Sequence, residues 1–232
     1  MSAAPIHLAG ERLMLDPAGA LYWPAEGLLA VSDLHLEKGS SFATRGSLLP
    51  PWDSKVTLER LFVLMRRYKP RTVVALGDSF HDAGAAGRLG EAERARLATM
   101  TSAAAFIWVH GNHDPAPPDG IAGAWTHVYA QGGLTFRHEP GAAGGEICGH
   151  FHPKAGIATR TGHVSRPCFV TNAGRIMMPA FGAYTGGLDV QSPAIHKLFP
   201  RGGRVFLLGK DRLFSFALGG PQRAASELQP GT

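Results

Sequence analysis

The sequence predicts an α/β fold in which helices flank two β-sheets within one domain. Two patterns lead to this prediction. In the first half of the chain, short apolar runs alternate with amphipathic helical segments, which indicates parallel strands joined by helices. In the second half, short strand-like segments are separated by glycines, which is typical of a meander. The chain has 232 residues and an apolar content of 44%, enough for one sizeable core.

The first half begins with ERLML and ALYWP around the turn sequence DPAG, and this arrangement predicts a hairpin. The apolar run LLAVS, residues 28–32, then predicts a buried strand. Asp53 and Ser54 offer an N-cap for a helix that extends to about Tyr68 and ends before Pro70. The alternation continues with a strand at TVVAL, a helix and a strand at AFIWV. The solvent-exposed side of that helix is expected to carry Glu91, Glu93, Arg94 and Arg96.

The second half contains WTHVYAQGGLTFRHE, EICGH, GIATRT and PCFVTNAG, which predict short strands. VFLLG and RLFSFAL, joined by KD, predict a closing hairpin. We expect a single domain over residues 1–220 and a disordered tail over 221–232. The composition of the final segment, GGPQRAASELQPGT, is typical of a frayed chain end.

Composition narrows the class of protein. The net charge of +5 favours a phosphate-bearing or nucleic-acid partner. Cys148 and Cys168 are not spaced as C-x-x-C and cannot form a disulfide framework, so we expect a reducing, cytoplasmic setting. The N-terminus lacks the pattern of a signal peptide, and no apolar segment is long enough to cross a bilayer, so no membrane partner is expected.

Polar side chains directly follow each of the three predicted parallel strands. They are Asp33 and His35 after the first strand, Asp78, His81 and Asp82 after the second, and Asn112, His113 and Asp114 after the third. The carboxyl ends of parallel strands open onto one crevice, where ligands bind. The later segments FRHEP and CGHFHPK add His138, His150 and His152, and in an extended segment the last two project to the same side.

These side chains form a set of oxygen and imidazole donors without a thiolate: Asp33, His35, Asp78, Asn112, His138, His150 and His152. One metal cannot use so many ligands, but two metals that share a carboxylate can. Such donors suit Mn, Fe, Zn, Co or Ni. Two divalent ions ~3.5–4 Å apart are the usual apparatus for displacement at phosphorus. The sequence therefore predicts a dinuclear metal centre for phosphoester chemistry.

Each motif alone has a simpler interpretation. SDLHL and LGD can end a strand in a hydrogen-bonded turn, GNHD can be a turn that uses the asparagine at positive φ, and GHFH can be two surface histidines. The occurrence of all of them in this order, each at a strand end, is what favours the metal centre.

The order D-x-H, G-D, G-N-H-D, a single histidine and G-H-x-H, from Asp33 to His152, resembles the calcineurin-like metallophosphoesterases. This resemblance implies a four-layer α-β-β-α sandwich of two mixed sheets flanked by helices. It implies that Asp33, His35 and His152 bind one metal, that Asn112, His138 and His150 bind the second, and that Asp78 bridges them. It also implies a metal-bridging hydroxide as the attacking group and two catalytic residues: His113, which faces the substrate, and Asp114, which orients His113.

SDLHLEKGSSFATRG, LPPWDS, LGDSFHD and PAFGAYTGGLD resemble a narrower group, the bacterial ligase-associated DNA damage response endonucleases. This resemblance implies manganese-dependent cleavage of DNA phosphodiester bonds in DNA repair. It also implies a pathway shared with an ATP-dependent DNA ligase and a helicase-like exonuclease.

Several side chains are candidates for supporting roles. Lys38, Arg45 and Arg175, together with Arg160 and Arg166, can hold substrate phosphates, and Tyr184 can stack a base. His81 and Asp82 can support the metal ligands from behind. The simpler interpretations are solvated cations, a packed tyrosine and loop solvation.

Two other functions compete with the nuclease. One is a small-molecule phosphoesterase that acts on nucleotides, cyclic nucleotides or a pyrophosphate with the same metals. The other is a non-catalytic scaffold, which predicts lost ligands, whereas every metal position is filled.

Overall fold

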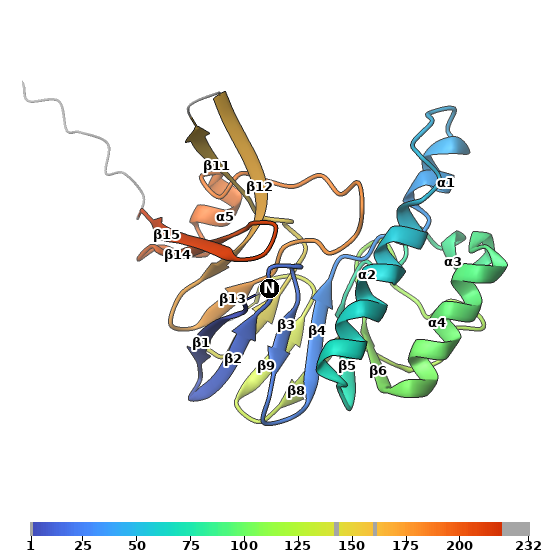
Figure 1. The fold of residues 1–232 in the computed structure, drawn as a ribbon, viewed down its shortest axis with the longest axis horizontal. Coiled ribbons are helices and arrows are strands. Elements are labelled where there is room, and N and C mark those ends of the chain that lie inside the picture. Colours follow the sequence, from blue (N-terminus) through green and yellow to red (C-terminus); the bar gives the residue numbers. More distant parts are fainter. Residues whose placement is uncertain (1, 142–143, 160–161, 220–232) are drawn as a thin grey trace, which may run out of the picture.

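In the computed structural model, the described residues are 2–141, 144–159 and 162–219, and they form two mixed β-sheets with flanking helices. The tail predicted over 221–232 lies outside the described residues, as does Arg160. The predicted α/β architecture is therefore confirmed. Figure 1 shows the two sheets packed together, with helices beside the strands of the first sheet.

The first sheet has seven strands in sequence order. They are β1 (Ala4–Leu8), β2 (Glu11–Leu15), β3 (Leu21–Trp23), β4 (Leu28–Ser32), β5 (Thr72–Leu76), β6 (Ala105–Val109) and β7 (Ala124–Thr126). The strands from β1 to β4 are antiparallel neighbours, and those from β4 to β7 are parallel. The predicted opening hairpin is β2 and β3, and β1 adds a strand that the sequence pattern did not predict.

The side chains of the central parallel strands alternate between two apolar layers. In β4, Leu29 and Val31 pack toward the helices, whereas Leu28 and Ala30 pack toward the second sheet. The strands β5 and β6 alternate in the same way. Side chains of a strand point to opposite faces with a period of two, so a strand covered on both sides reads as a continuous apolar run. This burial fixes the register and hence the level at which each strand ends.

Two long helices cover the outer face of the first sheet: α2 (Asp53–Tyr68) and α4 (Glu91–Ala103), with the short α1 (Lys38–Ala43) and α3 (Ala85–Arg88) nearby. The start of α2 differs from the prediction, because neither Asp53 nor Ser54 caps it. The Asp53 carboxylate instead accepts a hydrogen bond from the Gly39 amide at 3.1 Å, and the Ser54 hydroxyl accepts one from the Glu37 amide at 2.8 Å. These bonds tie α1 to α2.

The second sheet has eight strands: β8 (Val128–Gln131), β9 (Leu134–Arg137), β10 (Glu146–Cys148), β11 (Lys154–Thr159), β12 (Gly162–Thr171), β13 (Arg175–Met177), β14 (Gly203–Leu208) and β15 (Leu213–Leu218). It is not a simple meander, because β10 runs parallel to both β9 and β13. The predicted closing hairpin is β14 and β15. The outer face of the second sheet packs against Ile195 of the one-turn helix α5 (Pro193–His196) and against Phe199, which follows that helix.

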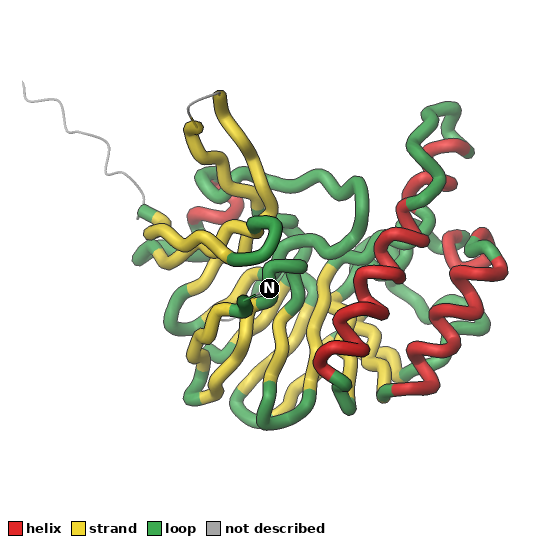
Figure 2. Tube along the Cα trace, in the orientation of Figure 1, coloured by secondary structure: helices red, strands yellow, loops and turns green. Residues whose placement is uncertain are grey.

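The fold positions the site by aligning strand ends. Figure 2 shows that loops, not helices or strands, follow the carboxyl ends of the central strands. Among the described residues, each helix is too short or too polar to cross a bilayer.

Candidate metal centre

Five loops at the ends of strands carry the predicted metal ligands. Asp33 and His35 follow β4, Asp78 follows β5, Asn112 follows β6, His138 follows β9, and His150 and His152 follow β10. The first sheet supplies three of these loops and the second sheet supplies two. The candidate metal centre, defined by these seven residues, therefore lies where the two sheets meet.

The structure brings six of the seven side chains together in two groups of three. The first group is Asp33, His35 and His152, and the second is Asp78, His138 and His150; within each, one donor atom per residue lies within 4.8 Å of the others. In the first group, His152 Nε2 lies 3.3 Å from Asp33 Oδ1 and 3.3 Å from His35 Nε2.

The second group includes the amide of Asn112 as a close neighbour. Asn112 Oδ1 lies 3.0 Å from His138 Nε2, and His150 Nδ1 lies 3.1 Å from the same nitrogen. These atoms converge on one point, as donors around a single cation do.

Asp78 lies between the two groups. Its Oδ2 atom is 3.4 Å from His138 Nε2 in one group and 3.9 Å from His35 Nε2 in the other. Its Oδ1 atom accepts a hydrogen bond from the His113 amide at 2.9 Å, which fixes the carboxylate in this orientation. The Oδ2 atom of Asp78 therefore lies near a donor atom of each group.

The backbone of the ligand residues is unusual. Asp33, His35, Asp78, His150 and His152 all adopt positive φ, between 43° and 71°. Non-glycine residues in this region cost of order 1–3 kcal/mol each and concentrate at functional sites. The prediction that His150 and His152 share one side of an extended segment is therefore wrong, because they lie in a turn and join different groups.

Two glycines allow the ligand loops to approach one another. At Gly77, a Cβ atom would lie 2.3 Å from the His138 ring, and φ is +68°. At Gly111, it would lie 2.1 Å from Asp78 Oδ1. No side chain fits at either position, so the glycines of the LGD and HGN sequences are part of the site. The sequence signal was present, since each glycine directly precedes a predicted ligand.

Ser32 is a further residue that the sequence analysis missed. Its hydroxyl donates to Asp33 Oδ2 at 2.5 Å, and the His150 amide lies 3.2 Å from the same oxygen. Asp33 Oδ1 lies 3.3 Å from His152 Nε2 in the first group and 3.6 Å from His138 Nδ1 in the second. The serine that precedes D-x-H was the available signal.

The pKa values of two ligand histidines are shifted in opposite directions, one by burial and the other by neighbouring carboxylates. Burial lowers the pKa of His35 to about 3, so the ring is neutral and keeps a lone pair for a cation. Burial alone would lower the pKa of His138 as well, but the Asp78 and Asp33 carboxylates outweigh it and raise that pKa to about 9. The same carboxylates attract a metal ion. Oxygen and imidazole donors grouped in this way fit divalent metal ions.

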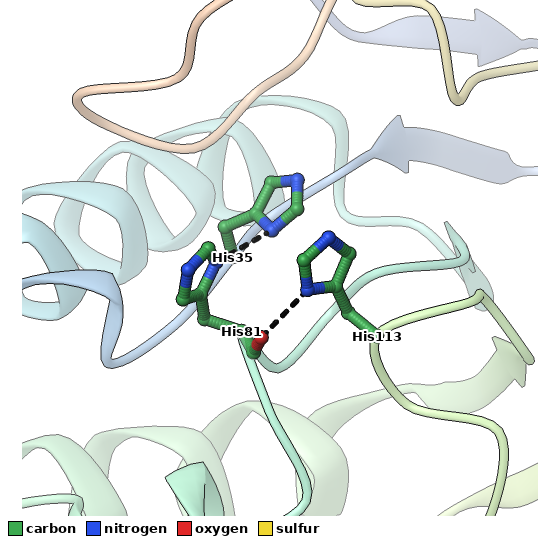
Figure 3. Close-up of side chains that lie close together, drawn as sticks. All are labelled: His35, His81 and His113. Carbon is green, nitrogen blue, oxygen red and sulfur yellow. Dashed lines mark hydrogen bonds between the residues drawn. The ribbon is translucent and has the colours of Figure 1, made fainter. Parts of the chain in front are cut away.

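His35, His81 and His113 form a third close group, shown in Figure 3. His81 Nδ1 lies 3.2 Å from His35 Nδ1, and His113 Nδ1 lies 2.7 Å from the carbonyl oxygen of His81. A carbonyl only accepts, so His113 Nδ1 carries the proton and Nε2 is left to face a ligand. His81 therefore contacts both the predicted metal ligand His35 and the predicted catalytic histidine His113.

Asp114 makes different contacts from those predicted. Its buried carboxylate accepts hydrogen bonds from the backbone amides of Ser79, Phe80 and Gly111 at 2.7, 3.1 and 2.9 Å. Burial raises its pKa to about 6. The His113 ring is oriented by the His81 carbonyl instead, so Asp114 joins the loop after β5 to the loop after β6.

Two predicted supporting residues have structural contacts instead. Arg175 was predicted to bind substrate, but it is buried, pairs with Glu146, and donates to Leu198 O at 3.1 Å. Asp82 was predicted to support the metal ligands, but it pairs with Arg88 at 2.7 Å and accepts from the Gly84 amide at 2.9 Å. Asp82 thus organises the start of α3. Both predictions were wrong for the same reason, because Arg175 and Asp82 each already pair with an oppositely charged side chain.

Of the remaining predicted substrate contacts, Lys38, Arg45 and Tyr184 lie in segments beside the centre, whereas Arg166 lies away from it, in a groove that none of the predicted ligands lines. Lys38 begins α1 and lies over the Phe42 ring at 5.8 Å, and Arg45 is exposed just beyond α1. Tyr184 is 44% exposed at positive φ in the loop after β13. In that loop, the Gly182 amide donates to Asp33 O at 3.1 Å, so the loop rests against the first ligand.

Residues 28–177 match the model of the calcineurin-like phosphoesterase family. The chain belongs to that family. A crystal structure of Pseudomonas putida nuclease MPE has a similar fold, with a TM-score of 0.71 and 25% sequence identity over 93% of this chain and 100% of the other. Yfce, a phosphoesterase from E. coli, matches with a TM-score of 0.39 and 13% identity over 83% and 99% of the two chains, too low to carry an argument. No curated protein matches the chain.

As a calcineurin-like phosphoesterase, the chain is a hydrolase of phosphoester bonds, and its His/Asp groups can bind divalent metal.

Proposed function

We propose that this protein is a manganese-dependent phosphodiesterase with a dinuclear metal centre, acting as a DNA endonuclease in cytoplasmic DNA repair. The likeness to the Pseudomonas putida nuclease MPE carries the proposal, because it extends over nearly the whole of both chains. The positive net charge of +5 also suits a polyanionic substrate.

In this proposal, Asp33, His35 and His152 hold the first metal, and Asn112, His138 and His150 hold the second. Asp78 contributes to both, in keeping with its contacts to His138 and His35. When bound, the two metals neutralise charge on the phosphate and supply the nucleophile for in-line displacement.

The protein's own contribution to the reaction includes His113. Because its Nδ1 is held by the His81 carbonyl at 2.7 Å, its Nε2 is fixed in direction. When the ring is protonated, Nε2 can donate to a phosphate oxygen or to the leaving oxygen. Lys38, Arg45 and Tyr184 border the centre and are proposed to contact neighbouring nucleotides.

The test uses metal-stripped protein that is reconstituted with manganese and incubated with supercoiled plasmid, with Asn112→Ala as the matched control. Nicking that requires both manganese and Asn112 supports the endonuclease. Hydrolysis of a small aryl phosphodiester without nicking moves the substrate to a small molecule and rejects DNA. If both activities persist at the wild-type rate in Asn112→Ala, the assignment of the second metal site is wrong.

The resemblance to ligase-associated enzymes also supports a pathway with an ATP-dependent DNA ligase and a helicase-like exonuclease. We propose functional association, and one form of it, physical contact, is tested by co-purification of the tagged protein with either enzyme from cells. Absence of both enzymes after chemical cross-linking would reject physical contact.

A further inference from the structure

A groove of about 700 Å³ lies between α2, the turn before β3 and the β12, β14 and β15 strands. Its apolar lining includes Leu207, Leu208 and Pro167. Phe214 stands at its side and is 46% exposed. None of the predicted metal ligands lines it, so it is distinct from the candidate metal centre.

The charged side chains of this groove are all cationic. Arg60, Arg166 and Lys210 line it, and among the described residues no carboxylate does. Arg166 and Lys210 are exposed, and neither lies within ion-pair distance of a described carboxylate. Arg212 adds a fourth cation nearby, with its guanidinium 4.8 Å from the centroid of the Phe214 ring. Unpaired cations beside an exposed aromatic ring suit a polymer with both phosphates and apolar rings.

The groove is connected to the metal centre through Arg60. Its guanidinium donates to Phe181 O at 2.9 Å and lies 4.4 Å from the Phe181 ring. The Phe181 amide in turn donates to Ser32 O at 2.8 Å, directly before the first predicted ligand. The wall of the groove and the edge of the metal centre are thus separated by one loop.

We propose that this groove binds the DNA backbone away from the cleaved phosphate, with Arg166 and Lys210 each contacting a phosphate and Phe214 packing against a sugar or base. This inference rests on the proposed nuclease function and extends it with a second binding surface. It gives a role to cations that line a groove in which no described carboxylate takes part. In this proposal, DNA bound in the groove reaches the candidate metal centre by crossing the loop that contains Phe181, which lies between them.

The test compares Arg166→Gln/Lys210→Gln with Arg12→Gln/Arg204→Gln. Arg12 and Arg204 are exposed and lie outside the groove, so the control removes the same charge. For metal-reconstituted protein, we would measure DNA binding by fluorescence anisotropy over a range of salt, together with hydrolysis of a small aryl phosphodiester.

We expect the slope of log affinity against log salt to fall by roughly 1.4 to 1.8 in the groove variant, since each phosphate contact contributes about 0.7 on a single strand and about 0.9 on a duplex. The control should keep the wild-type slope, and both variants should hydrolyse the aryl diester at the wild-type rate. Equal slopes in the groove variant and the control would overturn the proposal.

Failure of the nuclease proposal is recognised separately. If the wild-type protein hydrolyses the aryl diester but cuts no DNA, the nuclease function is rejected, and the binding slopes alone then decide the groove. If the groove variant loses aryl-diester hydrolysis as well, its effect is on the centre itself and the groove proposal is rejected.

Discussion

Replacing Asp114 with alanine tests whether this carboxylate holds two ligand loops together. The change leaves three backbone amides without their hydrogen-bond acceptor: those of the buried Ser79 and Phe80 and of the partly buried Gly111. An unsatisfied buried donor costs about 1–3 kcal/mol, so the gross loss is roughly 3–9 kcal/mol. Relief from burying the charge offsets part of it, about 3 kcal/mol for a shift to the raised pKa of about 6. Subtracting this relief leaves an expected net loss of roughly 0–6 kcal/mol in the free energy of unfolding, with about 3 kcal/mol as the central value.

Asp114→Asn is the matched variant. Its single carboxamide oxygen can still accept from the Ser79 and Phe80 amides, and only the Gly111 amide faces the NH₂ group without an acceptor, so this variant should be more stable than the alanine variant. Urea denaturation of both metal-free variants gives their stabilities. Because the two loops carry Asp78 and Asn112, metal affinity should also fall by roughly 10- to 100-fold in the alanine variant. A loss below about 0.5 kcal/mol with unchanged metal affinity would refute the reasoning.

Three further outcomes follow from the contacts. Arg175→Ala should cost about 3 kcal/mol in urea denaturation, because the buried Glu146 loses its closest cation and is left with the more exposed Arg137, 3.5 Å away. A stable variant with weakened DNA binding would instead restore Arg175 as a substrate contact. Gly77→Ala should lower metal affinity in calorimetric titration, since the new Cβ displaces the His138 ring, and unchanged affinity would contradict this. Burial and the Asp16 carboxylate raise the pKa of Tyr68 to about 12, so its contribution is present below pH ~10 and lost as pH rises toward 12. The wild type should therefore exceed Tyr68→Phe by about 1 kcal/mol near neutral pH and lose that advantage in alkali, and a pH-independent difference would be inconsistent with the Tyr68–Asp16 hydrogen bond.

The central strands were predictable because their burial is local in sequence. A strand covered on both faces needs an unbroken apolar run, and LLAVS, TVVAL and AFIWV supply it. The ligand residues were predictable for a related reason: parallel strands bring their carboxyl ends to one edge, so polar residues at successive strand ends must meet.

The supporting residues were not predictable in the same way. In the sequence, Arg175 is simply a cation that follows a ligand motif, as a phosphate-binding arginine would be. Only its burial against Glu146 in the structure shows that it has a structural role. Asp114 looked like a partner of His113 because the two are adjacent in the chain. In three dimensions its carboxylate turns toward the amides after β5, which are 34 and 35 positions away.

The sequence alone determined the fold class, the metal-binding edge and the chemical types of the ligands, since these depend on apolar periodicity and on which residues end each strand. Only the tertiary structure decided how His150 and His152 divide between two groups, and that Asp78 lies between them. It also decided which cations remain unpaired to form the groove around Arg166 and Lys210. The physical reason is that pairing and division of this kind depend on contacts between segments far apart in the chain, and local sequence patterns do not encode them.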